Sequence, residues 1–288
     1  MKKGWLICLM ISSLMILAGC QSGKSSLIEP GNSANPSMVS RSELAHVLAT
    51  EPNDQAKLSG MLVSGVLPHH LLAAPLITSF LYTLSIQQPS LIILVGPNHP
   101  NQGAKIITGL NDWQTPEGRM ETEQSIVNKL LQQGLAIRDE NTIANEHSIA
   151  SLIPIVHHYL PSAKVVPIIL QHEVSLAEVD KLLNALQPFI NKDGVVLASV
   201  DFSHYLTRPQ AQTKDNLTLK YMQNFDYTTL FSLDSDYLDS PAALACAFRH
   251  AQQQGVTRFQ VLANTNSGVI MRNDTMATTS YFTLVFTH

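Results

Sequence analysis

Short runs of large apolar residues recur along this chain and alternate with stretches that have helical spacing. The most apolar runs are residues 61–67, 91–96 and 194–200. Each run is bounded by turn-forming or polar residues, is too short to span a membrane, and stays largely apolar at consecutive positions. This pattern is typical of strands that are buried on both faces of a sheet.

The rest of the chain also alternates between predicted strands and predicted helices. Pro154 must kink or divide the helix that contains it, and Ser175 with Glu178 has the spacing of a capping box. Residues 113–118 are expected to form a loop. Alternating strands and helices predict an α/β domain with a mixed, mostly parallel sheet. Further strands are expected at 105–108, 163–170, 258–264 and 278–286, and helices at 121–133, 148–159, 175–189, 213–223 and 240–254, with one more ending near 86.

The amino terminus has the pattern of a secretory signal. Lys2 and Lys3 precede an apolar run, and Leu17-Ala18-Gly19-Cys20 resembles the bacterial lipobox, in which the cysteine becomes a lipid-modified amino terminus. We therefore expect a signal peptide at 1–19 and lipidation of Cys20; the alternative is an uncleaved anchor helix. Gln21 in place of aspartate favours the periplasmic face of the outer membrane, if the cell has two membranes.

A flexible tether is expected to follow the lipidated cysteine. The stretch after Cys20 is rich in Ser, Asn, Gly and Pro and has no apolar periodicity. We assign residues 20–57 to this tether, with a short helix at 41–50, and residues 58–288 to the folded domain.

Charge and cysteine content narrow the classes of function. Without Lys2 and Lys3 of the leader, 16 of the 18 basic residues remain against 22 acidic ones, a formal net charge of −6. No basic cluster is present to follow a phosphate backbone, so a nucleic-acid partner is not expected. Neither a GxGxxG motif nor a P-loop supports nucleotide binding. Cys246 is the one cysteine left once Cys8 is cleaved off and Cys20 is lipidated, so stability must come from packing rather than from a disulfide.

Three histidines follow the three most apolar strands. His69, His99 and His204 each lie just beyond a strand, at the edge of an α/β sheet where ligands bind. Imidazole is a common ligand for iron, copper and zinc, and ligands from separate strand ends can converge on one point. The pattern predicts a metal site. His70 competes with His69, and because neighbouring loop residues point in different directions, one of the two is expected to bind.

Two further groups are candidates for acid–base chemistry. Asp201 and His204 are close enough in sequence to form an acid/base pair. Alternatively, Asp201 only fixes its loop or caps the next element. His147, between Glu146 and Ser148, either donates a hydrogen bond to a bound oxygen species or holds the loop before a helix, where Glu and Ser are ordinary residues.

Five short motifs follow one another along the chain. They are Leu67-Pro68-His69, Gly96-Pro97-Asn98-His99, Trp113-Gln114-Thr115-Pro116, Glu146-His147-Ser148-Ile149 with Leu152-Ile153-Pro154, and Val200-Asp201-Phe202-Ser203-His204-Tyr205. Together they resemble the Memo family, including its bacterial branch called AmmeMemoRadiSam system protein B, and their order and spacing cover about residues 60–288. The resemblance implies an αβα sandwich similar to class III extradiol dioxygenases, which use a non-haem iron. It also implies that His69 and His99 bind the metal, that Asp201 and His204 lie beside it, and that His147 lies in the pocket.

The chain departs from the family at the third metal ligand. The family often has a cysteine there, followed by glycine and shortly before a proline that opens a helix, whereas this chain has Tyr237-Leu238-Asp239-Ser240-Pro241. Cys246 lies inside the following helix and is a poor replacement. Asp239 is the better candidate, and it would complete a set of two histidines and one carboxylate, which suits iron(II). Alternatively, Asp239 only caps the helix, or this branch has lost the metal.

These features lead to a lipid-anchored, metal-dependent enzyme of the non-haem iron or copper redox type, acting on a small molecule that the sequence does not identify. Its cofactor is expected to be a divalent transition metal ion, with Fe²⁺ favoured over copper because a carboxylate stands where a thiolate would suit copper(I). The alternative is a non-catalytic lipoprotein that uses the pocket to bind a metal, a small ligand or a partner. Zinc-dependent hydrolysis is a third possibility that the same ligands allow.

Overall fold

The structure is a computed structural model, and it describes residues 33–49, 58, 60–190 and 193–288. Gly31–His288 forms one compact unit. The predicted signal peptide and Cys20 lie outside the described residues. Within the described ranges, no helix combines the length and the apolar character that a membrane span requires.

Four parallel strands form the centre of a nine-stranded sheet. Their spatial order is β2, β9, β3 and β8, so β9 lies between two strands that precede it in the chain. The three most apolar runs of the sequence thus occupy neighbouring positions in the sheet. The strands are β2 (Leu62–Leu67), β9 (Gly194–Ser199), β3 (Leu91–Pro97) and β8 (Lys164–Leu170).

Antiparallel pairing extends the sheet on both sides of this centre. The last strand, β12 (Thr278–Thr287), runs antiparallel to β2 and also pairs with β10 (His204–Leu206) and β11 (Gln260–Asn266). Beyond β8, the antiparallel β4 (Ile106–Thr108) pairs in turn with β7 (Ile137–Arg138). The sheet is therefore mixed, with a parallel centre.

Apolar side chains of the central strands point alternately into two cores. In β3, Leu91, Ile93 and Val95 belong to one core, whereas Ile92 and Leu94 belong to the other. This explains why the run is apolar at consecutive positions: each face of the strand is covered.

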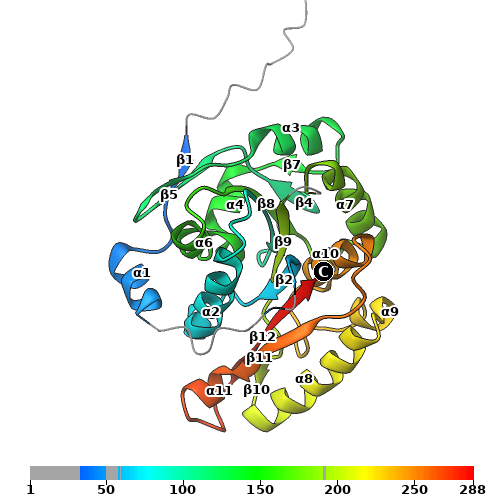
Figure 1. Cartoon of the computed structure of the whole chain (residues 1–288). Helices are drawn as coiled ribbons and strands as arrows, with labels where there is room; N and C mark the ends of the chain where they lie inside the picture. Colours follow the sequence, from blue (N-terminus) through cyan, green and yellow to red (C-terminus); the bar gives the residue numbers. More distant parts are fainter. Residues whose placement is uncertain (1–32, 50–57, 59, 191–192) are drawn as a thin grey trace, which may run out of the picture. The chain divides into compact units, whose positions relative to one another are not determined.

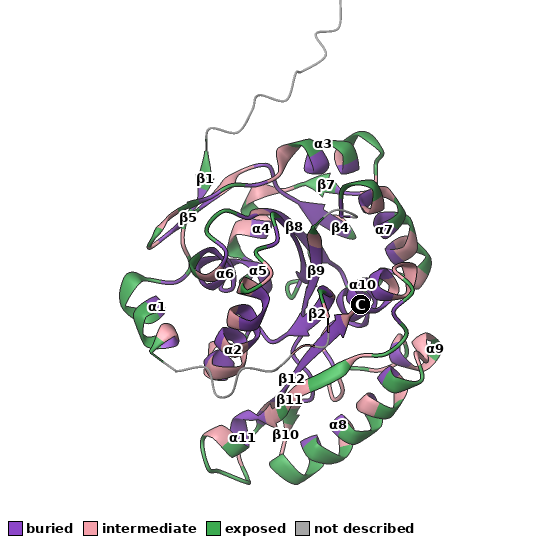
Figure 2. Ribbon diagram, in the orientation of Figure 1, coloured by how far each residue is buried: buried purple, intermediate pink, exposed green. Residues whose placement is uncertain are grey.

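Helices cover both faces of the sheet and complete the expected αβα sandwich (Figures 1 and 2). One core includes buried residues of α3, α7 and α10, and the other includes those of α1, α2 and α6. The helices are α1 (Arg41–Leu48), α2 (Ala74–Ser85), α3 (Gln124–Gln132), α6 (Ile153–Tyr159), α7 (Leu176–Ile190) and α10 (Pro241–Gln253).

Local sequence signals set several helix boundaries as predicted. Ser175 and Glu178 form the expected capping box before α7. Pro154 lies in the first turn of α6, and the predicted helix at 148–159 is divided there into α5 (His147–Ala150) and α6. The long α8 (Arg208–Gln223) begins earlier than predicted, because a capping box at Thr207 starts it.

Residues assigned to the flexible tether are partly folded. β1 (Ala34–Asn35) pairs in parallel with β5 (Asp112–Thr115), and α1 confirms the short helix expected at 41–50. Leu44 and Val47 of α1 are buried in the same core as α2. Residues of β1 and α1 therefore pack against the domain that was expected to begin at residue 58.

A hairpin replaces the loop that was expected at 113–118. It consists of β5 (Asp112–Thr115) and β6 (Gly118–Met120), and Trp113 is buried in the core beside it. Several short elements were not predicted: a 3₁₀ turn at Leu71–Ala73, α4 (Glu140–Asn145), α9 (Tyr227–Leu230) and α11 (Ser267–Ile270).

Candidate metal centre

Polar residues follow the four central strands at one edge of the sheet. His69 follows β2, Asp201 follows β9, His99 follows β3 and His172 follows β8. Because these strands are parallel, their carboxyl ends lie at the same edge, where ligands bind in open α/β sheets.

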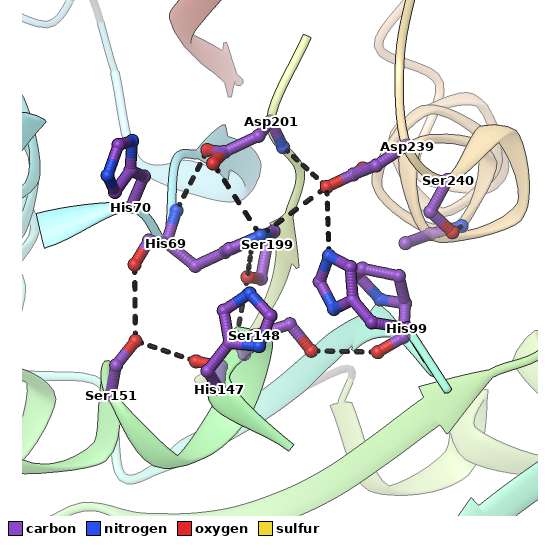
Figure 3. A network of polar contacts seen from close by, with 12 residues as sticks. His69, His70, His99, His147, Ser148, Ser151, Ser199, Asp201, Asp239 and Ser240 are labelled. Carbon is purple, nitrogen blue, oxygen red and sulfur yellow. Dashed lines mark hydrogen bonds and ion pairs between the residues drawn. The ribbon is translucent and has the colours of Figure 1, made fainter. Parts of the chain in front are cut away.

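Three histidine rings meet at this edge. One ring nitrogen from each of His69, His99 and His147 lies within 4.8 Å of the other two. His99 and His147 stack with ring centroids 4.1 Å apart, and the His69 ring stands edge-on to both, at 5.1 and 5.2 Å (Figure 3). The three rings could hold a metal ion. Sequence reasoning expected His69 and His99 as ligands and His147 only as a pocket residue, so the close approach of His147 is new.

Asp239 brings a carboxylate to two of these rings. Its Oδ2 atom lies 3.4 Å from Nε2 of His69 and 3.8 Å from Nε2 of His99. The alternative role of helix cap falls to Ser240 instead, whose hydroxyl accepts a hydrogen bond from the backbone N–H of Ala243. The Asp239 side chain is therefore free of the capping role and points to the histidines (Figure 3).

His69 is buried and held on several sides. Its backbone N–H donates to Oδ1 of Asp201 at 3.1 Å, and its Nδ1 shares a hydrogen bond of 2.9 Å with the hydroxyl of Ser199. The Ser151 hydroxyl donates to its carbonyl oxygen. Burial, reinforced by the neighbouring ring of His99, lowers the pKa of His69 well below its usual range, so the ring is neutral at neutral pH.

Glu146 holds His99 by both of its oxygens. Oε2 accepts a hydrogen bond from the backbone N–H of His99, and Oε1 accepts one from its Nδ1, each at 2.8 Å. Oε1 also accepts from the backbone N–H of Ser148, and it lies 3.3 Å from Nδ1 of His147. Burial raises the pKa of Glu146, but these hydrogen bonds outweigh it and lower the pKa to about 2. Glu146 is thus a carboxylate that orients His99.

Asp201 and His204 lie beside the cluster but do not form the expected pair directly. Among the described residues, no hydrogen bond joins the Asp201 carboxyl to the His204 ring. Asp201 instead binds the backbone of His69, while the backbone N–H of His204 donates to Ser235. Burial lowers the pKa of His204, and the Nδ1 atom of this ring is buried without a partner in the described structure.

The remaining candidates lie elsewhere. His70 points away from His69, and its Nδ1 makes a hydrogen bond of 2.6 Å with the Tyr281 hydroxyl, so one of the two neighbours faces the site as expected (Figure 3). Cys246 is buried in α10, within the core, and burial raises the pKa of its thiol. It is not part of the cluster.

An open cleft of about 340 Å³ leads to the site. His99, His172, His204 and Asp239 line it, and Tyr205 stands at its side with a positive φ of 61° and a largely exposed ring. No lysine or arginine is among the residues that line this cleft. A small molecule could therefore reach the histidines without meeting a fixed positive charge.

The side chains fit a divalent transition metal ion. Two ligand atoms about 2.1 Å from one ion lie about 3.0–3.4 Å apart at right-angled or tetrahedral geometry, and Asp239 Oδ2 is 3.4 and 3.8 Å from the two Nε2 atoms. Burial raises the pKa of Asp239 well above its usual range, and its Oδ1 is buried without a partner in the described structure. A cation at this point would offset the cost of burying this carboxylate.

Sequence reasoning missed two of the residues that hold the site. In the sequence, Glu146 has the pattern of an ordinary residue at the start of a helix, and it does cap α5. Ser199 is the last residue of an apolar strand. The signal for Glu146 was its position next to His147 in a motif, but nothing in the sequence showed that it would bond to His99, 47 residues away.

Comparison with known proteins places this fold and site in a family. A family model described as "Memo-like protein" matches residues 40–285. A MEMO1 family protein of Metallosphaera sedula is 29% identical over 184 residues, covering 62% of each chain. One from Pyrobaculum arsenaticum is 27% identical over 203 residues, covering 67% of this chain and 72% of that protein. The first of these matches spans less than two thirds of its relative's length.

A solved structure supports the fold. The crystal structure of the uncharacterized protein JW3007 from Escherichia coli K12 superposes with a TM-score of 0.52 and 11% sequence identity. The match covers 77% of this chain and 99% of that one. Because the family model spans most of the chain, including every residue of the candidate metal centre, this protein belongs to the Memo-like protein family.

Proposed function

We propose that this protein is a metal-dependent enzyme in which His69 and His99 hold a divalent transition metal ion, with Asp239 as the third ligand. The observation that carries the proposal is the convergence of both Nε2 atoms on Oδ2 of Asp239, at 3.4 and 3.8 Å. The Asp239 carboxylate, whose Oδ2 also accepts a hydrogen bond from the backbone N–H of Asp201, faces the rings of His69 and His99 in a cleft without lysine or arginine. A cation at this point would offset the cost of burying the carboxylate.

Iron(II) is the ion that this set favours. Two histidines and one carboxylate are typical of non-haem iron sites, whereas copper(I) prefers thiolate, and Cys246 lies apart in the core of α10. When bound, iron(II) supplies a redox-active Lewis acid with open positions for other ligands. His147 is the other candidate for third ligand, because its ring nitrogen belongs to the three-histidine group.

The protein's own residues would bind the substrate and handle protons. His204 lines the cleft, and since burial keeps its ring neutral, it can accept a proton from a bound molecule. The half-exposed His147, stacked on His99, can hold or release a proton at the opening of the site. Asp201 fixes the backbone of His69.

We further propose that the protein belongs to the AmmeMemoRadiSam system protein B branch and is a lipoprotein of the bacterial cell envelope, on the periplasmic face of the outer membrane if there are two membranes. The order of motifs supports the branch, and Leu17-Ala18-Gly19-Cys20 supports the anchor. Labelled fatty acid fed to expressing cells should enter the wild-type protein and not Cys20→Ser. Equal labelling of the two would overturn the anchor.

Turnover is tested by measuring oxygen consumption of the iron-loaded protein with a panel of small reductants. We expect uptake by the wild type, and His204→Ala should lose that uptake while keeping its iron. Zinc in place of iron would direct the search to hydrolysis. The alternative of a non-catalytic binding lipoprotein makes a different prediction. It would be favoured if the protein bound metal but turned over no substrate, and if cells tolerated His204→Ala.

A further inference from the structure

Two buried serines, Ser148 and Ser199, link the end of β3 to the His69 ring, and a third, Ser151, contacts the backbone of His69. The Ser148 hydroxyl donates to the carbonyl oxygen of Pro97 at 2.8 Å, and the Ser199 hydroxyl donates to the carbonyl oxygen of Ser148 at 2.6 Å. The Ser199 oxygen is also 2.9 Å from Nδ1 of His69. Ser151 donates to the carbonyl oxygens of both His69 and His147 (Figure 3).

The position of α5 makes this link possible. A Cβ atom at Gly96 would lie 2.6 Å from the Ser148 hydroxyl oxygen, so only glycine lets α5 approach the end of β3 this closely. The approach places the Ser148 carbonyl within reach of Ser199 on the neighbouring strand β9.

The direction of each hydrogen bond follows from proton counting. A serine hydroxyl has one proton, and a carbonyl oxygen can only accept. Because Ser199 gives its proton to Ser148, its oxygen can only accept from His69, and Nδ1 of His69 must carry the proton. A neutral imidazole has one N–H, so Nε2 of His69 keeps its lone pair. This nitrogen lies 3.4 Å from Oδ2 of Asp239 and 3.6 Å from Oδ2 of Asp201.

We propose that Ser199 is a positioning residue that fixes the Nδ1-protonated tautomer of His69 and thereby presents its Nε2 lone pair to the metal. This inference rests on the proposed metal site, and it gives His69 a different support from His99. His99 receives its orientation from the carboxylate of Glu146, whereas His69 receives it from a neutral hydroxyl whose own proton is committed to the backbone.

The test begins with the metal-free protein. The full chain is labelled with ¹⁵N-histidine, and two-bond ¹H–¹⁵N correlations of the rings report which nitrogen is protonated; His69→Asn assigns the signals. We expect a protonated Nδ1 and an unprotonated Nε2 in wild-type His69. A protonated Nε2 in the wild type would overturn the inference even if Ser199→Ala failed to fold.

Ser199→Ala then separates positioning from packing. We expect the His69 ring to lose its single tautomer and the affinity for Fe²⁺, measured anaerobically against a chromophoric chelator, to fall about 10–100-fold. Ser64→Ala is the matched control, because Ser64 is a buried serine of β2 whose hydroxyl donates to the carbonyl of Ala247, away from the site. It should change neither readout.

Two results distinguish failure of this inference from failure of the proposed function. Unchanged tautomer and unchanged Fe²⁺ affinity in Ser199→Ala would overturn the role of Ser199 and leave the metal site intact. No Fe²⁺ binding by the wild type would overturn the proposed function, whereas the ring spectra of the metal-free protein would still decide the tautomer of His69.

Discussion

The Oδ2 atom of Asp239 lies 3.4 Å from Nε2 of His69, and both side chains are almost fully buried. A carboxylate at such a position is costly unless a proton or a cation lies beside it. Burial accordingly raises the pKa of Asp239 well above its usual range. The close approach of Asp239 to His69 destabilises the metal-free protein, and it would favour a bound metal ion.

Asp239→Asn should therefore act in opposite directions on folding and on metal binding. Removing the buried charge should raise the free energy of unfolding of metal-free protein by about 1 kcal/mol or more, and it should lower the affinity for Fe²⁺ at least tenfold. Chemical denaturation and chelator competition measure the two effects. Asp236→Asn, at an exposed aspartate of the same loop, is the control and should alter neither. A metal affinity unchanged in Asp239→Asn would make His147 the third ligand.

Glu146→Gln tests the support of His99. Glutamine keeps one oxygen, which can accept from the N–H of Ser148 and from Nδ1 of His99, but it removes the charge and places an NH₂ group against the backbone N–H of His99. We expect Fe²⁺ affinity to fall about 10–100-fold and the melting temperature to fall as well, because two buried N–H donors then face each other. Glu123→Gln is the matched control, because Glu123 caps α3 in the same way and has no contact with a histidine of the cluster. Equal affinities in the two variants would contradict the role of Glu146.

His250 should make the stability of the fold depend on pH. Burial, with a smaller contribution from the charge of His288, lowers the pKa of His250 to about 4 in the folded state. In the unfolded chain a histidine titrates near 6.5. The unfolded state therefore binds the proton first, so stability that is complete above about pH 6.5 is lost as the pH falls toward 4, by at most about 1.4 kcal/mol per pH unit.

His250→Met removes this contribution, and denaturation at a series of pH values should show a shallower loss of stability between about pH 6.5 and 4 than in the wild type. His46→Gln, at an exposed histidine of α1, serves as the control and should keep the wild-type slope. A slope in His250→Met equal to that of the wild type would show that the ring does not stay neutral when folded.

The centre of the fold was predictable because a strand that is buried on both faces is apolar at consecutive positions. Residues 91–96 are apolar at every position up to Gly96, and the structure divides them between two cores. The position of His69 and His99 at one edge of the sheet was predictable from the same strands, because the carboxyl ends of parallel strands lie at the same edge. The roles of His204, Asp201 and His147 in catalysis stay predictions.

Features that depend on distant partners were not predictable. Residues 34–40 have the composition of a linker, yet β1 pairs with β5. The short helix expected at 41–50 forms, but the sequence did not show that it would bury Leu44 in the core. Glu146 caps a helix in the way many glutamates do, and only the fold reveals that its carboxylate also holds His99. Residues 113–118 contain Pro116 and Gly118, which are typical of a loop, whereas the structure confines the turn to Pro116 and Glu117 and places Gly118 in β6.

The most direct test of the central claim is the metal content of the protein, purified without oxygen or chelator and measured by elemental analysis. We predict close to one iron ion per chain in the wild type, with loss in His69→Ala and in His99→Ala. Cys246→Ala is the control and should keep its metal, because this thiol is buried in α10, apart from the site. No iron, copper or zinc in the wild type under any loading condition, or equal metal content in all of these variants, would contradict a metal site at His69 and His99.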